Sequence, residues 1–266
     1  MSHFSIALQI ALRARFGWLA GSTALVLIIS TILSSQFSGR QSATVAMDIG
    51  LSVIRLAVPL TLIIIAQELI SKDFERRYFL NTLSYPSPRH NFLLNRYAAL
   101  ATLTIGLLIG LSFLLAVCVW LISKGYQQST PIALGVPFLS TIIFFALEIF
   151  LLNAIAVFIA VTASTPSFVL IGTSGFMVIA RSFSPVIELL KGSATAAFST
   201  DGYRTGVGLL GYLLPDLGAL DIRMVALYGR MEFLPSNWPL LILSTVSYTI
   251  GILSLAVWAL QRKRIA

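Results

Sequence analysis

Residues Gln67–Arg96 read QELISKDFERRYFLNTLSYPSPRHNFLLNR, a charged stretch between two long apolar runs. The run before it is Met47–Ala66, and the run after it is Tyr97–Ser123. A helix needs about 20 predominantly apolar residues to cross the hydrocarbon core of a bilayer, and both runs reach that length. We therefore expect two membrane-crossing helices joined by a loop in water. A loop of this character is suited to docking a soluble partner.

The composition extends this interpretation to the whole chain. Of its 266 residues, 57% are hydrophobic and 11% are charged, whereas a soluble domain carries about 25% charged residues. The sequence therefore predicts an all-α integral membrane protein with one transmembrane domain over residues 1–266. The net charge is +8, but the basic residues flank apolar runs instead of lining one face. This placement argues against a nucleic-acid partner and favours contact with membrane lipid.

Six stretches are long and apolar enough to be read as membrane spans. Pro166 divides one long apolar region into two spans, because a proline cannot continue the hydrogen-bond ladder of a helix. The six predicted transmembrane helices are Phe16–Gly39, Met47–Ala66, Tyr97–Ser123, Val136–Val161, Ser167–Leu189 and Phe233–Gln261. An N-terminal signal peptide is the alternative for the first of these, but its apolar core exceeds the usual length of about 7–15 residues.

Two further segments are expected to lie at the membrane surfaces. Residues 1–16 form a predicted interfacial helix whose basic residues lie near anionic headgroups. Residues 190–237, between spans five and six, are predicted to form external amphipathic helices, with Asp216 as an N-cap after Pro215. These helices either cover an exit or pack only on their own bundle.

The distribution of basic residues predicts the orientation of the spans. Ten of them fall on one side, namely Arg13, Arg15, Lys72, Arg76, Arg77, Arg89, Arg96, Arg262, Lys263 and Arg264. The short loops on the other side contain only Arg40 and Lys124. By the positive-inside rule, both termini and the loop Gln67–Arg96 are predicted to be cytoplasmic.

Three charged residues inside the predicted spans are functional candidates, because a charge within the membrane is costly to keep there. They are Arg55, Glu148 and Arg181. At 1.5 Å per residue, Arg55 lies roughly 12 Å and Glu148 roughly 17 Å from the external ends of their helices. An ion pair between them is therefore allowed, and Arg181 is a rival partner for Glu148. The group either locks the helices together or takes part in substrate passage. Reversing both charges of the first pair is expected to restore in part what Glu148→Gln impairs.

Other motifs carry less information about function. Gly106 and Gly110 form a GxxxG pattern, which permits helices to approach closely, either within the bundle or in a dimer. Residues 206–211 match GxGxxG but lack the βαβ context of a dinucleotide site. The sequence contains no Walker motif, and His3 and His90 are its only histidines. We therefore expect no enzyme active site, no metal site and no cofactor in this chain.

The loop Gln67–Arg96 resembles that of permease subunits of type-2 ABC exporters. The resemblance is carried by Glu68 at the inner end of span two, by the run FERR at 74–77, and by LNTLSYPSPR at 80–89. The six-span layout also matches, and LLPDLGALD at 213–221 is similar to small permeases of nitrous-oxide-reductase maturation and haem-export systems. One departure is Tyr78-Phe79-Leu80, where these permeases typically have Gly-Thr-Leu.

The resemblance implies a subunit driven by a separate cytosolic ABC ATPase, which would hold the ATP and Mg. A short amphipathic helix in the loop would dock into a groove on that ATPase, with apolar anchors inside a polar rim. The implied coupling residues are Glu68, Lys72, Phe74, Glu75, Arg76, Arg77, Tyr78, Phe79, Leu80, Pro86 and Arg89. The chain would pair with a second copy or a homologous permease in the cytoplasmic (inner) membrane of a prokaryote.

Two functions of other classes remain open. The first is a stand-alone channel or secondary transporter that uses Arg55, Glu148 and Arg181. Such a transporter is expected to show inverted repeats and helices broken at the midplane. The second is a membrane scaffold that assembles partners without transporting anything.

Overall fold

A computed structural model describes residues 3–12, 16–71, 89–125, 133–163, 165–197 and 215–262. Over these ranges the chain is helical and contains no β-strand, which confirms the predicted all-α class. The main helices are α1 (His3–Ala11), α2 (Gly17–Phe37), α3 (Ser42–Ala66), α6 (Arg89–Gly125), α7 (Val136–Thr162), α8 (Pro166–Ala197), α10 (Arg223–Tyr228) and α11 (Trp238–Arg262). Short helical turns are η2 (Gly39–Gln41), η3 (Gln67–Ser71) and η4 (Met231–Phe233).

Five helices in the described ranges are long and apolar enough to cross a membrane. They are Gly17–Phe37, Ser42–Ile70, His90–Gly125, Val136–Thr162 and Trp238–Arg262. Each coincides with a predicted span and differs from it by a few residues at one or both ends. The agreement follows from the physics of the signal, because the length of an uncharged apolar run is a local property of the sequence.

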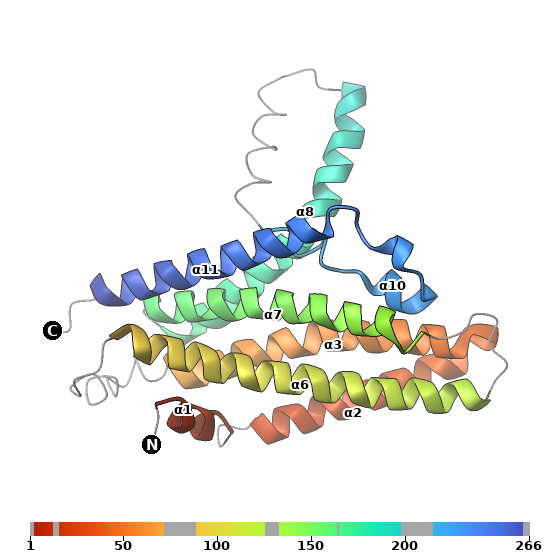
Figure 1. Ribbon diagram of the computed structural model, residues 1–266, viewed down its shortest axis with the longest axis horizontal. Helices are drawn as coiled ribbons and strands as arrows, with labels where there is room; N and C mark the ends of the chain where they lie inside the picture. The colour runs from red at the N-terminus through yellow and green to blue at the C-terminus, as the bar shows by residue number, and fades with distance from the viewer. Residues whose placement is uncertain are drawn as a thin grey trace.

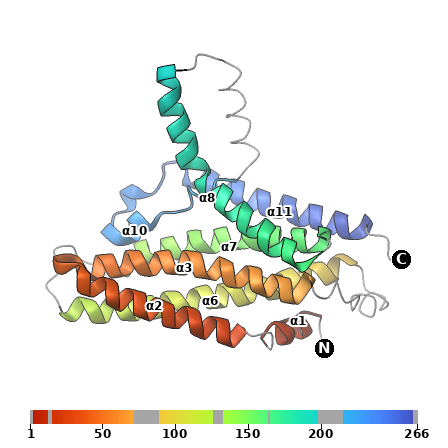
Figure 2. The same ribbon diagram turned by 180° about the vertical axis from the view of Figure 1, so that it is seen from behind.

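The sixth predicted span, Ser167–Leu189, is not among these five helices. Its apolar part, Pro166–Ser182, is shorter than the five helices above. Figures 1 and 2 show α8 bending partway along and its second half projecting away from the other helices. Pro185 lies in this helix and has no N–H to bond the carbonyl of Arg181, a usual cause of a helix bend. From sequence, Pro166 was predicted to break the apolar region, whereas Pro185 was given no role.

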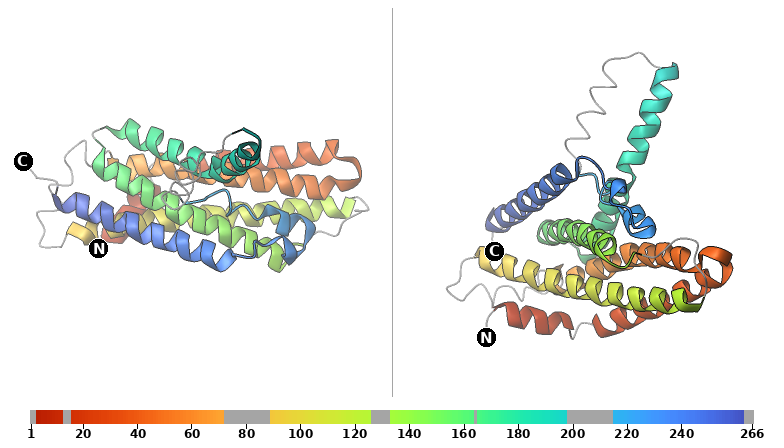
Figure 3. Two further views of the ribbon diagram at one scale, coloured as in Figure 1. Left: turned by 90° about the horizontal axis from the view of Figure 1, so that it is seen from above. Right: turned by 45° about the vertical axis from the view of Figure 1, so that its right-hand side comes forward.

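The long helices run side by side with α7 at the centre, in contact with α3, α6, α8 and α11. Figure 3 shows α8 and α11 flanking α7 on its side away from α2. We call the end that holds α1, η3 and the last turn of α11 the terminal end (Figure 1). The opposite end, which holds η2 and α10, is the distal end, and residues 215–237 are the distal segment. The segment predicted as an interfacial helix is helical over His3–Ala11 and packs against α6 and η3.

Close packing of α3 against α6 depends on Gly50. A Cβ added at this position would overlap the side chain of Leu115, which is fully buried. Gly106 and Gly110 instead lie exposed on α6, and no described residue comes within 4 Å of a Cβ added at either position. The described part of the bundle therefore does not use this motif for packing, because GxxxG specifies a helix face and not the neighbour that meets it. Its use in a dimer stays a prediction.

Two tryptophan–cation pairs stand at opposite ends of the bundle. Lys124 Nζ lies 3.6 Å from the ring centroid of Trp120, at the distal end of α6. Arg262 Cζ lies 4.2 Å from the ring centroid of Trp258, at the terminal end of α11. Tryptophan and long basic side chains are typical of the two membrane–water interfaces, so these pairs mark the levels at which the bundle would leave a bilayer.

Candidate functional site

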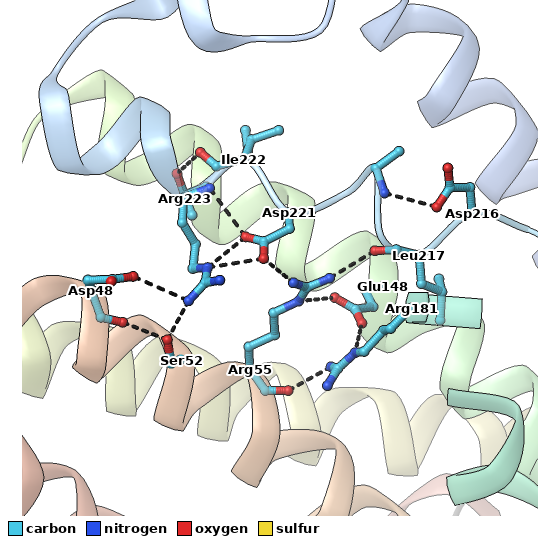
Figure 4. Close-up of polar contacts among 12 residues, drawn as sticks. Asp48, Ser52, Arg55, Glu148, Arg181, Asp216, Leu217, Asp221, Ile222 and Arg223 are labelled. Carbon is cyan, nitrogen blue, oxygen red and sulfur yellow. Dashed lines mark hydrogen bonds and ion pairs between the residues drawn. The ribbon is translucent and has the colours of Figure 1, made fainter. Parts of the chain in front are cut away.

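The three charged residues singled out in the spans come together from three helices in the distal half of the bundle (Figure 4). Arg55 Nε donates to Glu148 Oε2 at 3.1 Å, and Arg181 Nε donates to Glu148 Oε1 at 2.6 Å. The Glu148 side chain is only 2% exposed. The carboxylate is therefore shared between two guanidinium groups, and both the expected pair and its rival are present.

Arg181 also bonds the main chain of α3. Its Nη2 donates to the backbone carbonyl of Arg55 at 2.7 Å. This carbonyl would normally accept from the N–H four residues later, but that residue is Pro59, which has none. The guanidinium of Arg181 thus satisfies a carbonyl that the proline leaves without its helical partner.

Arg55 connects the bundle to the distal segment. Its Nη1 donates to Asp221 Oδ2, and its Nη2 donates to the backbone carbonyl of Leu217 at 2.9 Å. Asp221 lies 166 positions after Arg55 in the sequence. The sequence analysis treated the distal segment separately from the intramembrane charges, whereas the structure joins them through one guanidinium.

A second arginine extends the same set of contacts. Arg223 Nε donates to the two oxygens of Asp221 at 2.8 and 3.1 Å. Its Nη1 donates to Asp48 Oδ1 at 3.3 Å and to the hydroxyl of Ser52. Asp48, Ser52 and Arg55 are spaced i, i+4, i+7, which places them on one face of α3. That spacing was a signal the sequence analysis did not use, and it missed Asp48, Ser52, Asp221 and Arg223 as site residues.

We call these side chains the ion network. It consists of three arginines and three carboxylates with one hydroxyl, namely Arg55, Arg181, Arg223, Asp48, Glu148, Asp221 and Ser52. The formal charges balance. Exposure decreases from the Asp48 side chain, at 47%, to Glu148, so the network runs from the surface into the bundle.

Apolar contacts hold the distal segment against the bundle beside the ion network. α10 packs on α7 and α3, and the segment buries Leu217, Leu220, Ile222, Val225 and Ala226. This is packing of the segment on its own bundle, one of the two alternatives left open above. Only one short α-helix, α10, forms in the described part of the segment.

The turn that begins the distal segment differs from the predicted helix start. Asp216 Oδ1 accepts a hydrogen bond from the backbone N–H of Ala219 at 3.0 Å, but this closes a turn, and α10 begins only at Arg223. Gly218 in this turn lies against α8, where an added Cβ would stand 2.8 Å from the carbonyl oxygen of Arg181. The N-cap prediction was therefore wrong.

A small cavity of about 10 Å³ adjoins the ion network on its bundle side. It is lined by Ile54, Arg55, Pro59, Leu108, Phe145, Glu148, Ile149 and Arg181. Such a volume has room for about one water molecule. An apolar wall thus lies beside the guanidinium groups of Arg55 and Arg181. We call the arrangement in which Arg55 is bonded to the distal segment the closed distal end.

The two stems of the loop Gln67–Arg96 are bonded to each other at the terminal end. Arg96, which is 8% exposed, donates from Nη1 to the backbone carbonyl of Leu69 at 3.0 Å. Its guanidinium carbon lies 5.3 Å from the ring centroid of Phe92. Leu69 belongs to η3, a π-helical turn that continues α3, so Arg96 fixes the point at which the chain leaves α3.

Most of the predicted ATPase-coupling residues fall outside the described ranges. Glu68 lies in η3, and Arg89 is the first residue of α6. Those outside are Lys72, Phe74, Glu75, Arg76, Arg77, Tyr78, Phe79, Leu80 and Pro86. Their role stays a prediction from the sequence.

Comparison with known proteins adds no family to this geometry. No protein-family model matches the chain, and a search of curated proteins found no significant match. Among the described residues, no group of three or more His, Cys, Asp or Glu side chains is arranged to hold a metal ion. The ion network and the bonded stems of the loop are therefore the features from which a function can be argued.

Proposed function

We propose that this protein is the transmembrane subunit of an ATP-driven ABC exporter. It would work as a dimer with separate cytosolic ATPase subunits, which hold the ATP and Mg, and it would move its substrate outward. In this proposal the chain itself is not an enzyme. The second permease in the dimer is either another copy of this chain or a homologue.

The observation that carries this proposal is the continuity of α3. This helix and η3 run unbroken from the distal end to the stem of the loop. Arg55 of the ion network and Leu69, which accepts the bond from Arg96, are roughly 21 Å apart along this axis. A force applied to the loop by a soluble partner would therefore reach the contacts that hold the distal segment.

The same layout supports a six-span topology with both termini in the cytoplasm. α1 and the last turn of α11 lie at one end of the bundle (Figure 1). Five crossings would place them on opposite sides of a membrane, so α8 is proposed as the sixth. The excess of basic residues in the termini and in the loop then assigns the terminal end to the cytoplasm of a prokaryote.

Binding of ATP would change the equilibrium between two arrangements of the bundle. A ligand shifts such an equilibrium only by its difference in affinity for the two states. The ATPase dimer would supply this difference by closing on ATP and moving the docked loops. The closed distal end described above is then the arrangement before release of the substrate.

Co-purification from native membranes tests the proposal. We expect an ATP-binding chain to be recovered with the tagged protein and to be identified by mass spectrometry. The double variant Phe74→Asp with Tyr78→Asp should release it, because both apolar anchors would carry a charge. His90→Asp adds a charge within the loop at an exposed position outside the proposed docking set, and it should retain the partner.

Two results would contradict the proposal. One is purification without any ATPase; the other is transport that persists unchanged in the double variant. Transport driven by an ion gradient in the absence of ATP would favour a secondary transporter that uses the ion network instead.

A further inference from the structure

We propose that Arg55 and Arg181 form a binding site for the anionic head of an amphipathic molecule, and that Asp221 occupies this site in the closed arrangement. The ligand class is a single apolar chain that ends in a carboxylate or a phosphate. Such a site names the substrate class of the proposed exporter, and to that extent it rests on the proposed function.

Around Glu148, the described residues of the bundle bring together more positive than negative charge. Arg55 and Arg181 share one carboxylate, that of Glu148. Asp221 of the distal segment supplies a second carboxylate to Arg55. The other carboxylate of the bundle, Asp48, lies on the more exposed side and pairs with Arg223, which also binds Asp221. Arg55 and Arg181 thus form a local cationic site to which the distal segment brings an anion.

The donors of Arg55 are arranged for an anion that arrives from the distal side. Its Nε is used within the bundle by Glu148, whereas Nη1 and Nη2 both donate to the distal segment. The acceptors are the Asp221 carboxylate and the Leu217 carbonyl (Figure 4). Two neighbouring N–H groups of a guanidinium match the oxygens of a carboxylate or phosphate. One such group could accept both hydrogen bonds that the distal segment now accepts.

Opening of the distal end would leave Nη1 and Nη2 of Arg55 without these acceptors, although Nε would keep its bond to Glu148. Loss of the Asp221 carboxylate is unfavourable, because the two guanidinium groups would then share a single negative charge. A substrate with an anionic head would replace Asp221 and remove most of that cost. Bound substrate would therefore favour the open arrangement by differential binding.

The surroundings of the site select an anion with an apolar body. The cavity beside the two arginines is walled by Ile54, Pro59, Leu108, Phe145 and Ile149. The guanidinium carbon of Arg55 lies 5.8 Å from the centroid of the Phe145 ring. A small hydrophilic anion has no apolar surface to pack against these side chains, so it would not remove them from contact with polar groups. An alkyl chain behind the anionic head would be favoured, because each CH₂ that it buries against these side chains is removed from water.

Competition between ligand and Asp221 is measured by the accessibility of Leu220. This residue is fully buried in the distal segment, and Cys118 is the chain's single cysteine. We would label Leu220→Cys in a Cys118→Ser background with a maleimide, in nanodiscs. Laurate or dodecyl phosphate should speed labelling about tenfold by shifting the population toward the open state, and dodecyltrimethylammonium should not. The more effective of the two anions identifies the head group. Equal rates with all three additives would overturn the proposal.

Anion rescue gives a second measurement that does not depend on the Leu220 variant. Asp221→Asn should lower the melting temperature of the purified protein, and laurate or dodecyl phosphate should restore it, because a ligand stabilises the state that binds it. The double variant Asp221→Asn with Arg55→Gln should show no rescue. Glu232→Gln removes an exposed acidic residue of the same segment. It should change neither the melting temperature nor the response of that temperature to the two anions.

Rescue that persists without Arg55, or that is absent in Asp221→Asn, would overturn the proposal. Both measurements use the full chain without ATP or a partner. Their failure is therefore distinct from failure to recover an ATPase, which tests only the proposed function.

Discussion

The guanidinium of Arg181 donates to the backbone carbonyl of Arg55 at 2.7 Å, so α8 is bonded to the main chain of α3 as well as to the carboxylate of Glu148. Replacing the Arg55 side chain cannot remove this bond, whereas replacing Arg181 removes it together with an ion pair. The carbonyl is open to Arg181 because Pro59 has no N–H to offer it. The ion network therefore depends on a proline as well as on charges.

A double-mutant cycle between Pro59 and Arg181 should detect this dependence. Arg181→Met leaves the Arg55 carbonyl buried without a donor, which costs about 1–3 kcal/mol in addition to the lost ion pair. Pro59→Ala supplies a backbone N–H, so the two changes should cost less together than the sum of their separate effects. The free energy of unfolding in mixed micelles measures the coupling. The cycle between Pro59→Ala and Arg55→Gln is the control and should be additive, since it leaves that carbonyl in place. Coupling of equal size in both cycles would contradict the role of Arg181.

Glu148→Gln should be among the most destabilising single changes in the ion network. It removes the buried carboxylate that two largely buried guanidinium groups share, and of these only Arg55 keeps another carboxylate, that of Asp221. Loss of one partner from a buried pair costs about 3–5 kcal/mol. Asp48→Asn, at a side chain that is 47% exposed, should cost about 0–1 kcal/mol. Chemical unfolding of the purified variants checks both values, and similar losses in the two variants would argue against a buried network.

The structure changes the expected outcome of charge reversal. Exchanging the charges of Arg55 and Glu148 would place an arginine at position 148 against Arg181, and a glutamate at position 55 against Asp221. The double variant should therefore not recover what Glu148→Gln loses. Melting of both variants beside the wild type tests this, and substantial recovery would show that the first pair acts alone.

Gly50→Ala should loosen the packing of α3 on α6. The added methyl group overlaps the side chain of Leu115, and overpacking a core costs about 1–3 kcal/mol. Leu115→Ala should relieve the overlap, so the pair should show favourable coupling in an unfolding experiment. Gly106→Ala meets nothing within 4 Å and should be neutral or stabilising by up to about 1 kcal/mol. An equal loss at both glycines would contradict the contact.

Arg96→Met should uncouple the loop from the bundle, while the methionine retains an unbranched apolar side chain at that position. The Leu69 carbonyl would lose a hydrogen bond from a charged donor, a bond worth about 1.5–3 kcal/mol. If a partner ATPase is recovered, its hydrolysis should depend less on the permease in this variant than in the wild type. Arg262→Met removes a cation that lies over Trp258 on α11 and serves as the control. Unchanged stability and unchanged hydrolysis in Arg96→Met would remove Arg96 from the coupling path.

The membrane spans could be predicted from sequence because the relevant signals are local. The run Val136–Val161 was located to within one residue of α7, since its length and lack of charge do not depend on any other part of the chain. The pairing of Arg55 with Glu148 could be predicted in part, because the depth of a residue in the membrane follows from its position along the helix. The sixth predicted span, Ser167–Leu189, stays a proposal, because the apolar part of α8 is the shorter helix Pro166–Ser182 and Pro185 lies beyond it.

The partners of these helices required the tertiary structure. Gly106 and Gly110 form a recognisable motif, yet the glycine that α6 meets is Gly50, because sequence spacing defines a face without defining its neighbour. In the same way, Asp216 is a residue type typical of an N-cap, but its carboxylate closes a turn with Ala219 and the helix begins only at Arg223.

The sequence by itself determined that this chain is helical, apolar over membrane-spanning lengths, and charged at a few buried positions. These properties follow from composition and periodicity within one segment at a time. Only the tertiary structure decided that Arg55 bonds both Glu148 and Asp221, and that Arg181 donates a hydrogen bond to the backbone carbonyl of Arg55 in α3. The reason is that an ion network is satisfied by groups far apart in the chain, and only the packing of α3, α7 and α8 with the distal segment brings them within hydrogen-bonding distance.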